Sequence, residues 1–188
     1  INEPVTSISL GSSNFSTVEE GIPGQIIESF IIDDPDLGEN HSYLLTGQDA
    51  KYFDVVDGVL QLKSDIALDY EALNFNSYDD SGNPIKLLTA TVTVIDSGGY
   101  AVKNNFSIQV LNTNDVPSGL TLDGTGINKN SNLIGKLNVS DQDDQAFTFS
   151  VDNQNFEIVD GYLQLKNDAD LQGELWDTLI ISITATDS

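Results

Sequence analysis

The sequence predicts an all-β protein built from two tandem Greek-key β-sandwiches, the second without its last strand. Three observations lead to this prediction. Residues 53–71 (FDVVDGVLQLKSDIALDYE) and 156–174 (FEIVDGYLQLKNDADLQGE) align without a gap, 103 positions apart. Apolar and polar residues alternate with a period of two in several short segments, which is typical of half-buried strands. No segment shows the apolar periodicity of an amphipathic helix.

The first unit contains five clear strand candidates. They are short and rich in β-branched and aromatic residues, and turn sequences such as Asp57-Gly58 and Ser97-Gly98-Gly99 separate them. The candidates are 25–32, 42–46, 59–63, 87–95 and 105–111. Six or seven strands in a unit of about 110 residues without cysteine predict a sandwich of immunoglobulin-like shape.

A second internal match gives the domain boundary. Residues 2–10 (NEPVTSISL) align with residues 114–122 (NDVPSGLTL), so the chain opens where a linker between units would lie. We therefore expect one unit over 1–113 and a second over 114–188. The first unit carries an insertion between Glu71 and Asp96, where we expect a longer hairpin. The second unit stops before a counterpart of 100–111. Three explanations are open: the sequence has a boundary there, the strand returns later in a parent chain, or a partner supplies it.

Composition excludes several classes of function. The chain has 30 acidic residues against 7 basic ones, all of them lysine, and a net charge of −23. Nucleic acids and anionic membranes are bound through lysine and arginine, so neither is expected as a partner. The absence of cysteine excludes thiol catalysis and sulfur-ligated metals, and the single histidine, His41, excludes a histidine cluster. We expect no membrane insertion and no enzymatic activity.

The acidic residues gather in short motifs at the ends of predicted strands. These motifs are Glu19, Asp34-Pro35-Asp36, Leu68-Asp69-Tyr70-Glu71, Asp96, Asn112-Thr113-Asn114-Asp115, Asp141-Gln142-Asp143 and Asp187. Carboxylate, amide and carbonyl oxygens are the ligands that Ca²⁺ prefers. Carboxylates that lie close together repel one another, and a divalent ion cancels that repulsion. The pattern therefore predicts calcium binding.

The order and spacing of these motifs resemble the cadherin family, whose repeats carry an early Glu, an LDRE motif, a DxNDN linker, a DxD motif and a late Asp. They are more similar still to the bacterial cadherin-like repeats of large surface adhesins, in which DPDxG, LDYE and DSGG are usual. The sequence contains these three motifs at 34–38, 68–71 and 96–99, and residues 1–4 approximate a VNEAP-like linker. The resemblance covers nearly the full chain. It implies an extracellular, calcium-dependent module of a bacterial cell surface.

The resemblance also implies which residues hold the ions. About three calcium ions are expected at the junction of the two units and one more at the N-terminal end of the first unit, each with oxygen ligands. On the first unit the implied ligands are Glu19, Asp69, Glu71 and Asp115, completed by the Thr113 carbonyl and Asp143. On the second unit they are Asn114, the Val116 carbonyl, Asp141, Asp143 and Asp187. At the N-terminal end they are Asn2, Asp34, Asp36 and Asp96.

Some positions depart from the family pattern. Asn130 and Gln172 replace two acidic ligands in the second unit, although Glu174 remains, so a junction with a third unit is expected to bind calcium weakly or not at all. Tyr70 stands where the family usually has an arginine, and we expect little effect because its neighbours are the ligands. His41 is expected to be exposed and inert.

The leading hypothesis is a calcium-rigidified extension module of a larger surface protein, with neighbouring repeats of the same chain as partners. One alternative is a module that binds a carbohydrate or peptide through the insertion around Tyr78 or the open edge of the second unit. Another is homophilic or strand-swapped adhesion between identical modules. Trp176 suits either a stacked sugar ring or simple packing, and Asp79-Asp80 is expected to form a solvated hairpin tip.

Overall fold

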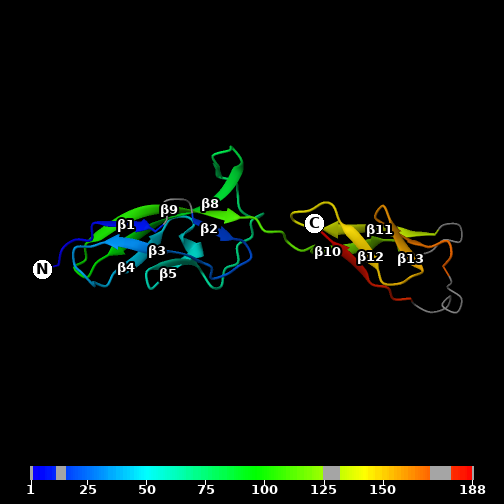
Figure 1. Cartoon of the computed structure of the whole chain (residues 1–188), viewed down its shortest axis with the longest axis horizontal. Helices are drawn as coiled ribbons and strands as arrows, with labels where there is room; N and C mark the ends of the chain where they lie inside the picture. The colour runs from blue at the N-terminus through cyan, green and yellow to red at the C-terminus, as the bar shows by residue number, and fades with distance from the viewer. Residues whose placement is uncertain (1, 12–15, 125–131, 170–178, 188) are drawn as a thin grey trace. The chain divides into compact units, whose positions relative to one another are not determined.

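The computed structural model describes residues 2–11, 16–124, 132–169 and 179–187. This part of the chain contains strands, turns and one short 3₁₀ helix but no α-helix (Figure 1). The chain divides into two compact units, Ile1–Thr113 (unit 1) and Asn114–Ser188 (unit 2). The predictions for Asn130, Gln172, Glu174 and Trp176 concern residues outside the described ranges.

Unit 1 has two β-sheets. The first has the strand order β1-β3-β6-β5 and is antiparallel throughout. The second has the order β2-β9-β8-β4, in which β2 runs parallel to β9, and the short strand β7 pairs with β8. The N-terminal segment therefore contributes one strand to each sheet. The bounds are β1 Ser7–Leu10, β2 Ser16–Glu19, β3 Ile26–Asp33, β4 Ser42–Thr46, η1 Ala50–Tyr52, β5 Phe53–Val56, β6 Val59–Leu62, β7 Ser77–Tyr78, β8 Pro84–Ile95 and β9 Ala101–Leu111.

The core of unit 1 lies between these two sheets. Its buried side chains come from both, such as Leu60 and Leu62 from β6 and Ile108 from β9. The ring of Phe106 meets the ring of Phe53 edge-on, with 5.4 Å between centroids. Burying a side chain of this size contributes about 1.5–3 kcal/mol. The alternation of buried and exposed residues along β9 is the period-two pattern that predicted a strand.

All five strand candidates are strands; β8 begins three residues earlier than expected, and β9 covers the range 100–111 that the comparison of the two units indicated, apart from its first residue. Their ladder runs without interruption from Lys86↔Val110 to Ile95↔Ala101. The additional residues of β9 include Lys103 and Asn104, which are exposed and carry no apolar signal. Hydrogen bonding to β8 and the partly buried side chain of Val102 therefore fix this end of the strand.

The internal repeat has a structural counterpart in one turn. Asp57 and Asp160 adopt φ of 49° and 50°, and the following Gly58 and Gly161 adopt 78° and 77°. Two successive residues with positive φ are the mark of a type I′ turn, which suits two-residue hairpins. This turn joins β5 to β6 in unit 1 and β13 to β14 in unit 2.

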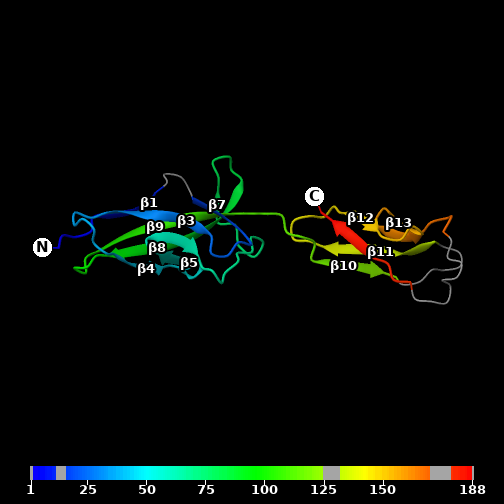
Figure 2. The ribbon, with the colours of Figure 1, turned by 60° about the horizontal axis from the view of Figure 1, so that its bottom comes forward.

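Unit 2 repeats the strand arrangement of unit 1. One sheet has the order β10-β11-β14-β13, and β12 pairs with β15 in the other (Figure 2). Among the described residues β15 pairs only with β12, whereas its counterpart β8 lies between β4 and β9. The bounds are β10 Gly119–Asp123, β11 Leu133–Ser140, β12 Thr148–Val151, β13 Phe156–Val159, β14 Tyr162–Leu165 and β15 Ile183–Thr186.

The buried core of unit 2 is small within the described ranges. Its buried apolar side chains there are Leu137, Phe156 and Leu163. In unit 1, β9 adds three such side chains, Phe106, Ile108 and Val110, and the described part of unit 2 has no strand in that position. The predicted fold class, all-β with Greek-key sandwiches, is confirmed. In the described ranges no helix has the length and apolar character needed to cross a membrane.

The insertion of unit 1 forms a hairpin, as expected. β7 pairs with the first residues of β8, and the hairpin stands away from the two sheets in Figures 1 and 2. Asp79 closes its tip, because its carboxylate accepts hydrogen bonds from the backbone N–H groups of Ser81 and Asn83 and from the Asn83 side chain. The Asn83 side chain, then these backbone groups, hold the pKa of Asp79 below its usual value.

This lowered pKa predicts an acid-sensitive hairpin. A carboxyl whose pKa is lower in the folded state stabilises that state above its unfolded pKa, and the contribution is lost as pH falls through the folded pKa. We expect Asn83→Ala to raise the pKa of Asp79, measured by carboxyl carbon NMR. Asn105→Ala, which removes an amide side chain on β9 outside the hairpin, is the control and should leave the pKa of Asp79 unchanged. An unchanged pKa of Asp79 in the variant would contradict the conclusion that Asn83 lowers this pKa.

Candidate metal centres

Three carboxylates converge at the end of unit 1 where β2 and β9 both finish. Glu20, Asp69 and Glu71 each place one carboxylate oxygen within 4.8 Å of the others, and we call them the LDYE cluster. The cluster includes two residues of the Leu68-Asp69-Tyr70-Glu71 motif. All its donors are hard oxygens, so the chemistry of the set suits calcium.

Glu20 is the best-fixed member of the LDYE cluster. Its side chain is buried, and its two oxygens accept the backbone N–H groups of Tyr70 at 2.6 Å and of Thr113 at 2.8 Å. Its own backbone N–H donates to the Leu111 carbonyl at 3.2 Å. Glu20 therefore fastens the LDYE motif to the end of β9. The same contact brings Thr113, a predicted ligand, to this cluster.

Glu20 takes the place that the sequence analysis gave to Glu19. Glu19 is the last residue of β2, and its side chain is exposed and outside the cluster. Side chains alternate across a strand, so the residue two positions after the buried Val18 points to the same inner face. That alternation was readable in the sequence and would have selected Glu20.

The other members of the LDYE cluster also accept hydrogen bonds, one from a neighbour in the chain and one from the residue after β9. Asp69 accepts the backbone N–H of Ala72 at 3.0 Å, and Glu71 accepts the Asn112 side-chain amide at 3.4 Å. Burial raises the pKa of Tyr70 between them, and the negative charges of Glu71 and Glu20 raise it further. The Tyr70 phenol thus lies within electrostatic reach of the cluster.

A second carboxylate set lies at the opposite end of unit 1, where β3 ends. Asp34, Asp36 and Glu39 place one oxygen each within 4.8 Å of one another, and we call them the DPD cluster. Asp34 accepts the backbone N–H of Asp36 at 2.9 Å, and Asp36 accepts that of Glu3 at 2.5 Å. Glu39, which the sequence analysis did not select, has a buried Oε2 with no hydrogen-bond partner.

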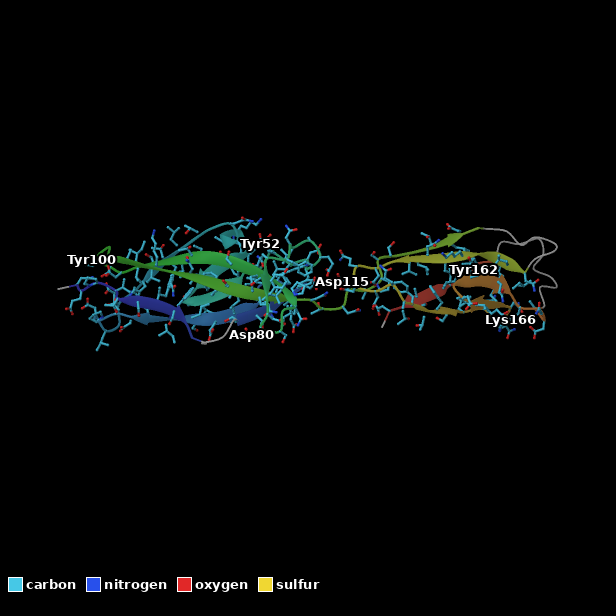
Figure 3. All side chains as sticks on the ribbon, turned by 90° about the horizontal axis from the view of Figure 1, so that it is seen from above. Tyr52, Asp80, Tyr100, Asp115, Tyr162 and Lys166 are labelled. Atoms are coloured by element: carbon cyan, nitrogen blue, oxygen red, sulfur yellow. The ribbon has the colours of Figure 1, made fainter. Side chains whose placement is uncertain are left out.

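Asn2 and Asp96 lie at the same end. Asp96 is buried, and its two oxygens accept the backbone N–H groups of Val5 and Tyr100. Figure 3 shows Tyr100 at this tip of the unit. The side-chain oxygen Oδ1 of Asn2 accepts a hydrogen bond from the Ser97 hydroxyl, and Ser97 donates its backbone N–H to Glu39. The structure thus brings Asn2, Asp34, Asp36 and Asp96 to one strand end.

His41 differs from expectation. Its Nε2 lies 2.8 Å from Oδ2 of Asp34, and its side chain is only 12% exposed. The prediction that His41 is exposed and inert is therefore wrong. The hydrogen bond from His41, followed by the backbone N–H of Asp36, holds the pKa of Asp34 below its usual value. This ring therefore occupies Oδ2 of Asp34.

Unit 2 repeats the DPD arrangement around Asp141-Gln142-Asp143. Asp141 accepts the backbone N–H of Asp143 at 2.8 Å, and Asp143 accepts that of Asp115 at 2.6 Å. Asn114 donates to Asp187 at 3.1 Å. We call Asn114, Asp115, Asp141, Asp143 and Asp187 the DQD cluster. Figure 3 labels Asp115 at the start of unit 2. The next residue, Val116, has an exposed side chain.

The DQD and DPD clusters share two hydrogen bonds, one of them between the two aspartates of the motif. In each, the residue after a leading asparagine donates its N–H to the second Asp of the motif. The difference lies at the first Asp: Oδ2 of Asp34 meets His41, whereas Oδ2 of Asp141 is buried without a hydrogen-bond partner. A buried carboxylate oxygen without a donor is costly, and a bound cation would satisfy it. The residues therefore fit a calcium ion.

The role of Glu20 can be tested without metal. Glu20→Ala leaves two backbone N–H groups without an acceptor, at about 1–3 kcal/mol each when buried. We expect a net loss in the free energy of unfolding of unit 1, smaller than this sum because the substitution also relieves the repulsion of Glu20 with Asp69 and Glu71, measured by urea denaturation in EDTA. Glu19→Ala is the matched control and should change it by less than about 0.5 kcal/mol. Equal effects of the two substitutions would contradict the assignment.

Comparison with known proteins shows the fold. No family model matches the sequence, and no curated protein matches it. Among solved structures, human protocadherin-24 EC1-2 is similar with a TM-score of 0.56, 21% identity, and coverage of 79% of this chain and 71% of that one. Protocadherin PcdhgB3 EC1-4 is similar with a TM-score of 0.59 and 19% identity, over 96% of this chain and 45% of that one. Mouse cadherin-23 EC22-24 is similar with a TM-score of 0.54 and 20% identity, over 94% of this chain and 58% of that one. The chain thus has a cadherin-like β-sandwich fold.

Proposed function

We propose that this chain is a calcium-rigidified, cadherin-like extension module of a larger extracellular adhesion protein. Calcium binds at the junction of its two units, on both sides of the Thr113–Asn114 boundary. One observation carries the proposal: the DPD and DQD clusters repeat the same contacts at the start of each unit. Such repetition is expected if each unit presents ligands to an ion shared with the unit before it.

The proposed ligands come from two sets. Unit 1 supplies Glu20, Asp69, Glu71 and the Thr113 carbonyl, with Glu20 in place of Glu19. Unit 2 supplies the DQD cluster and the Val116 carbonyl. About three ions at this junction follow from the resemblance to cadherin repeats, with ligands shared between ions, since each calcium takes six to eight oxygens. A further ion would bind the DPD cluster with Asn2, Asp96 and Glu39.

Electrostatics supports this assignment. Two carboxylates within 4.8 Å of one another repel by roughly 3 kcal/mol at an effective dielectric of about 20. A divalent ion replaces that repulsion with attraction. When free calcium exceeds the dissociation constant a hundredfold, each ion adds about 2.7 kcal/mol to stability. Millimolar extracellular calcium would therefore keep the ligand sets ordered.

The setting and partners belong to the same proposal. Calcium-dependent rigidity is useful outside the cell, where calcium is abundant, and a bacterial cell surface fits the motifs DPDxG, LDYE and DSGG. The partners would be neighbouring repeats of the same protein and identical modules on other chains. The chemistry proposed is binding without turnover.

Chelation tests the proposal. In EDTA we expect the unfolding temperature to fall by about 10 °C or more, because each lost ion removes a stabilising term and small domains change by about 4–8 °C per kcal/mol. Calorimetric titration of the EDTA-treated chain should show three to four calcium ions, the count that the resemblance to cadherin repeats implies. Unchanged melting and no heat of binding would refute calcium binding.

A single ligand provides a sharper test. Asp141→Asn keeps an oxygen for the N–H of Asp143 but removes the charge, so we expect calcium affinity in unit 2 to fall about tenfold or more. Asp152→Asn is the matched control, because Asp152 also accepts a backbone N–H, that of Ser182, outside the DQD cluster. The control should bind calcium like the wild type. Small-angle scattering should show a wider spread of radii of gyration for Asp141→Asn than for the control in calcium.

A further inference from the structure

Lys86 is a buried lysine beside the LDYE cluster. It is 4% exposed. Its Nζ donates a hydrogen bond to the Tyr70 carbonyl and lies 3.7 Å from the centre of the Tyr70 ring and 4.8 Å from that of Phe75. A cation over an aromatic face is attracted by the ring, and more strongly where water is excluded. The two rings and the carbonyl thus form a cage for the ammonium group.

Strand register directs this lysine toward the cluster. Lys86 of β8 pairs with Val110 of β9, and Val110 pairs with Val18 of β2. Val18 and Val110 are buried, so this row of three residues faces the inside of the sandwich. Glu20 follows Val18 by two positions and faces the same side. Lys86 and Glu20 therefore approach the same end of the core from two strands of one sheet.

A continuous set of hydrogen bonds links them. The ammonium of Lys86 binds the carbonyl of Tyr70, the N–H of Tyr70 binds Glu20, and Glu20 binds the N–H of Thr113. Tyr70 stands between two members of the cluster, Asp69 and Glu71. The hydrogen bonds to the N–H and the carbonyl of Tyr70 therefore fix the backbone positions from which the side chains of Asp69 and Glu71 extend.

Lys86 has no ordinary counter-ion. Within the described ranges the ion pair at contact distance is that of His41 with Asp34, and no carboxylate lies that close to Nζ of Lys86. Burying an ammonium group costs several kcal/mol unless its charge is compensated. The carboxylates that could compensate it by proximity are those of the LDYE cluster. They remain free of direct contact with the lysine and available to a second cation.

We infer that Lys86 is a built-in cation that holds the LDYE cluster together in the absence of calcium and repels calcium when it binds. This inference rests on the proposed calcium site. Lys86 is a positioning residue, because it acts through Tyr70 and touches no proposed ligand. Tyr70 supplies the aromatic ring and, through its backbone, the carbonyl for this lysine.

The test compares Lys86→Met with Lys86→Arg and with the matched control Lys103→Met. Methionine keeps the length of the stem without the charge, and arginine restores the charge. Lys103 is exposed on β9 and loses the same charge far along the strand from Val110. Unfolding temperatures are measured in EDTA and in millimolar calcium. Calcium is titrated by ¹⁵N NMR at the amides of Tyr70 and Thr113, which report on this cluster alone.

We expect Lys86→Met to lower the unfolding temperature more in EDTA than in calcium. We also expect the variant to bind calcium about threefold more tightly or better, because a like charge has been removed. Lys86→Arg and Lys103→Met should resemble the wild type in both measurements. A variant that folds only with calcium would support the inference in the same way. A lysine with a merely structural role would instead weaken calcium binding when removed.

Two results would overturn the inference. One is an equal loss of unfolding temperature in EDTA and in calcium with unchanged or weaker calcium affinity. The other is wild-type amide shifts for Tyr70 and Thr113 in Lys86→Met without calcium. If the wild-type amides fail to respond to calcium, the proposed site fails instead, and the EDTA comparison of Lys86→Met with Lys103→Met still decides whether Lys86 holds the cluster.

Discussion

Backbone N–H groups left over at strand ends fix the acidic side chains of this protein. Where a strand stops, its last donors lose their partners in the sheet, and buried donors without acceptors are costly. Here aspartate and glutamate accept them: Glu20 takes the N–H groups of Tyr70 and Thr113, and Asp96 takes those of Val5 and Tyr100. The same carboxylates that close the strand ends are thereby held still, with lone pairs that remain for a cation.

This constraint explains why the two units agree in detail despite differing in size. The DPD and DQD clusters share the bond between the two aspartates and the bond from the residue that follows the leading asparagine. The cores above them differ, since β9 contributes buried side chains for which the described part of unit 2 has no counterpart. The ends of the strands are conserved between the units more faithfully than the packing. They differ mainly in the group that meets the first aspartate, which is His41 in unit 1.

Much of this could be predicted from the sequence. Strands were visible where one face is buried, as in β9 from Phe106 onward, whereas the start of β8 at Pro84 lies before the range that the sequence indicated. Motif positions such as Asp34, Asp69 and Asp141 were visible because each belongs to a short acidic motif whose order resembles that of cadherin repeats. Glu39, His41 and Lys86 were not, because their roles come from contacts across the fold: Glu39 with Ser97, and Lys86 with Tyr70. Glu20 lies between these cases, since strand alternation alone would have chosen it over Glu19.

The parallel pairing of β2 with β9 has a mechanical consequence. The chain enters unit 1 at one end and leaves it at the other, and four residue pairs from Ser16↔Ile108 to Glu19↔Leu111 join these strands side by side. A tensile force on the two ends of the unit pulls the strands along their length in opposite directions. All the hydrogen bonds between them then bear load together and must yield in shear. Resistance of that kind is governed by the rate of unfolding, and it would allow the unit to transmit a pull without unravelling strand by strand.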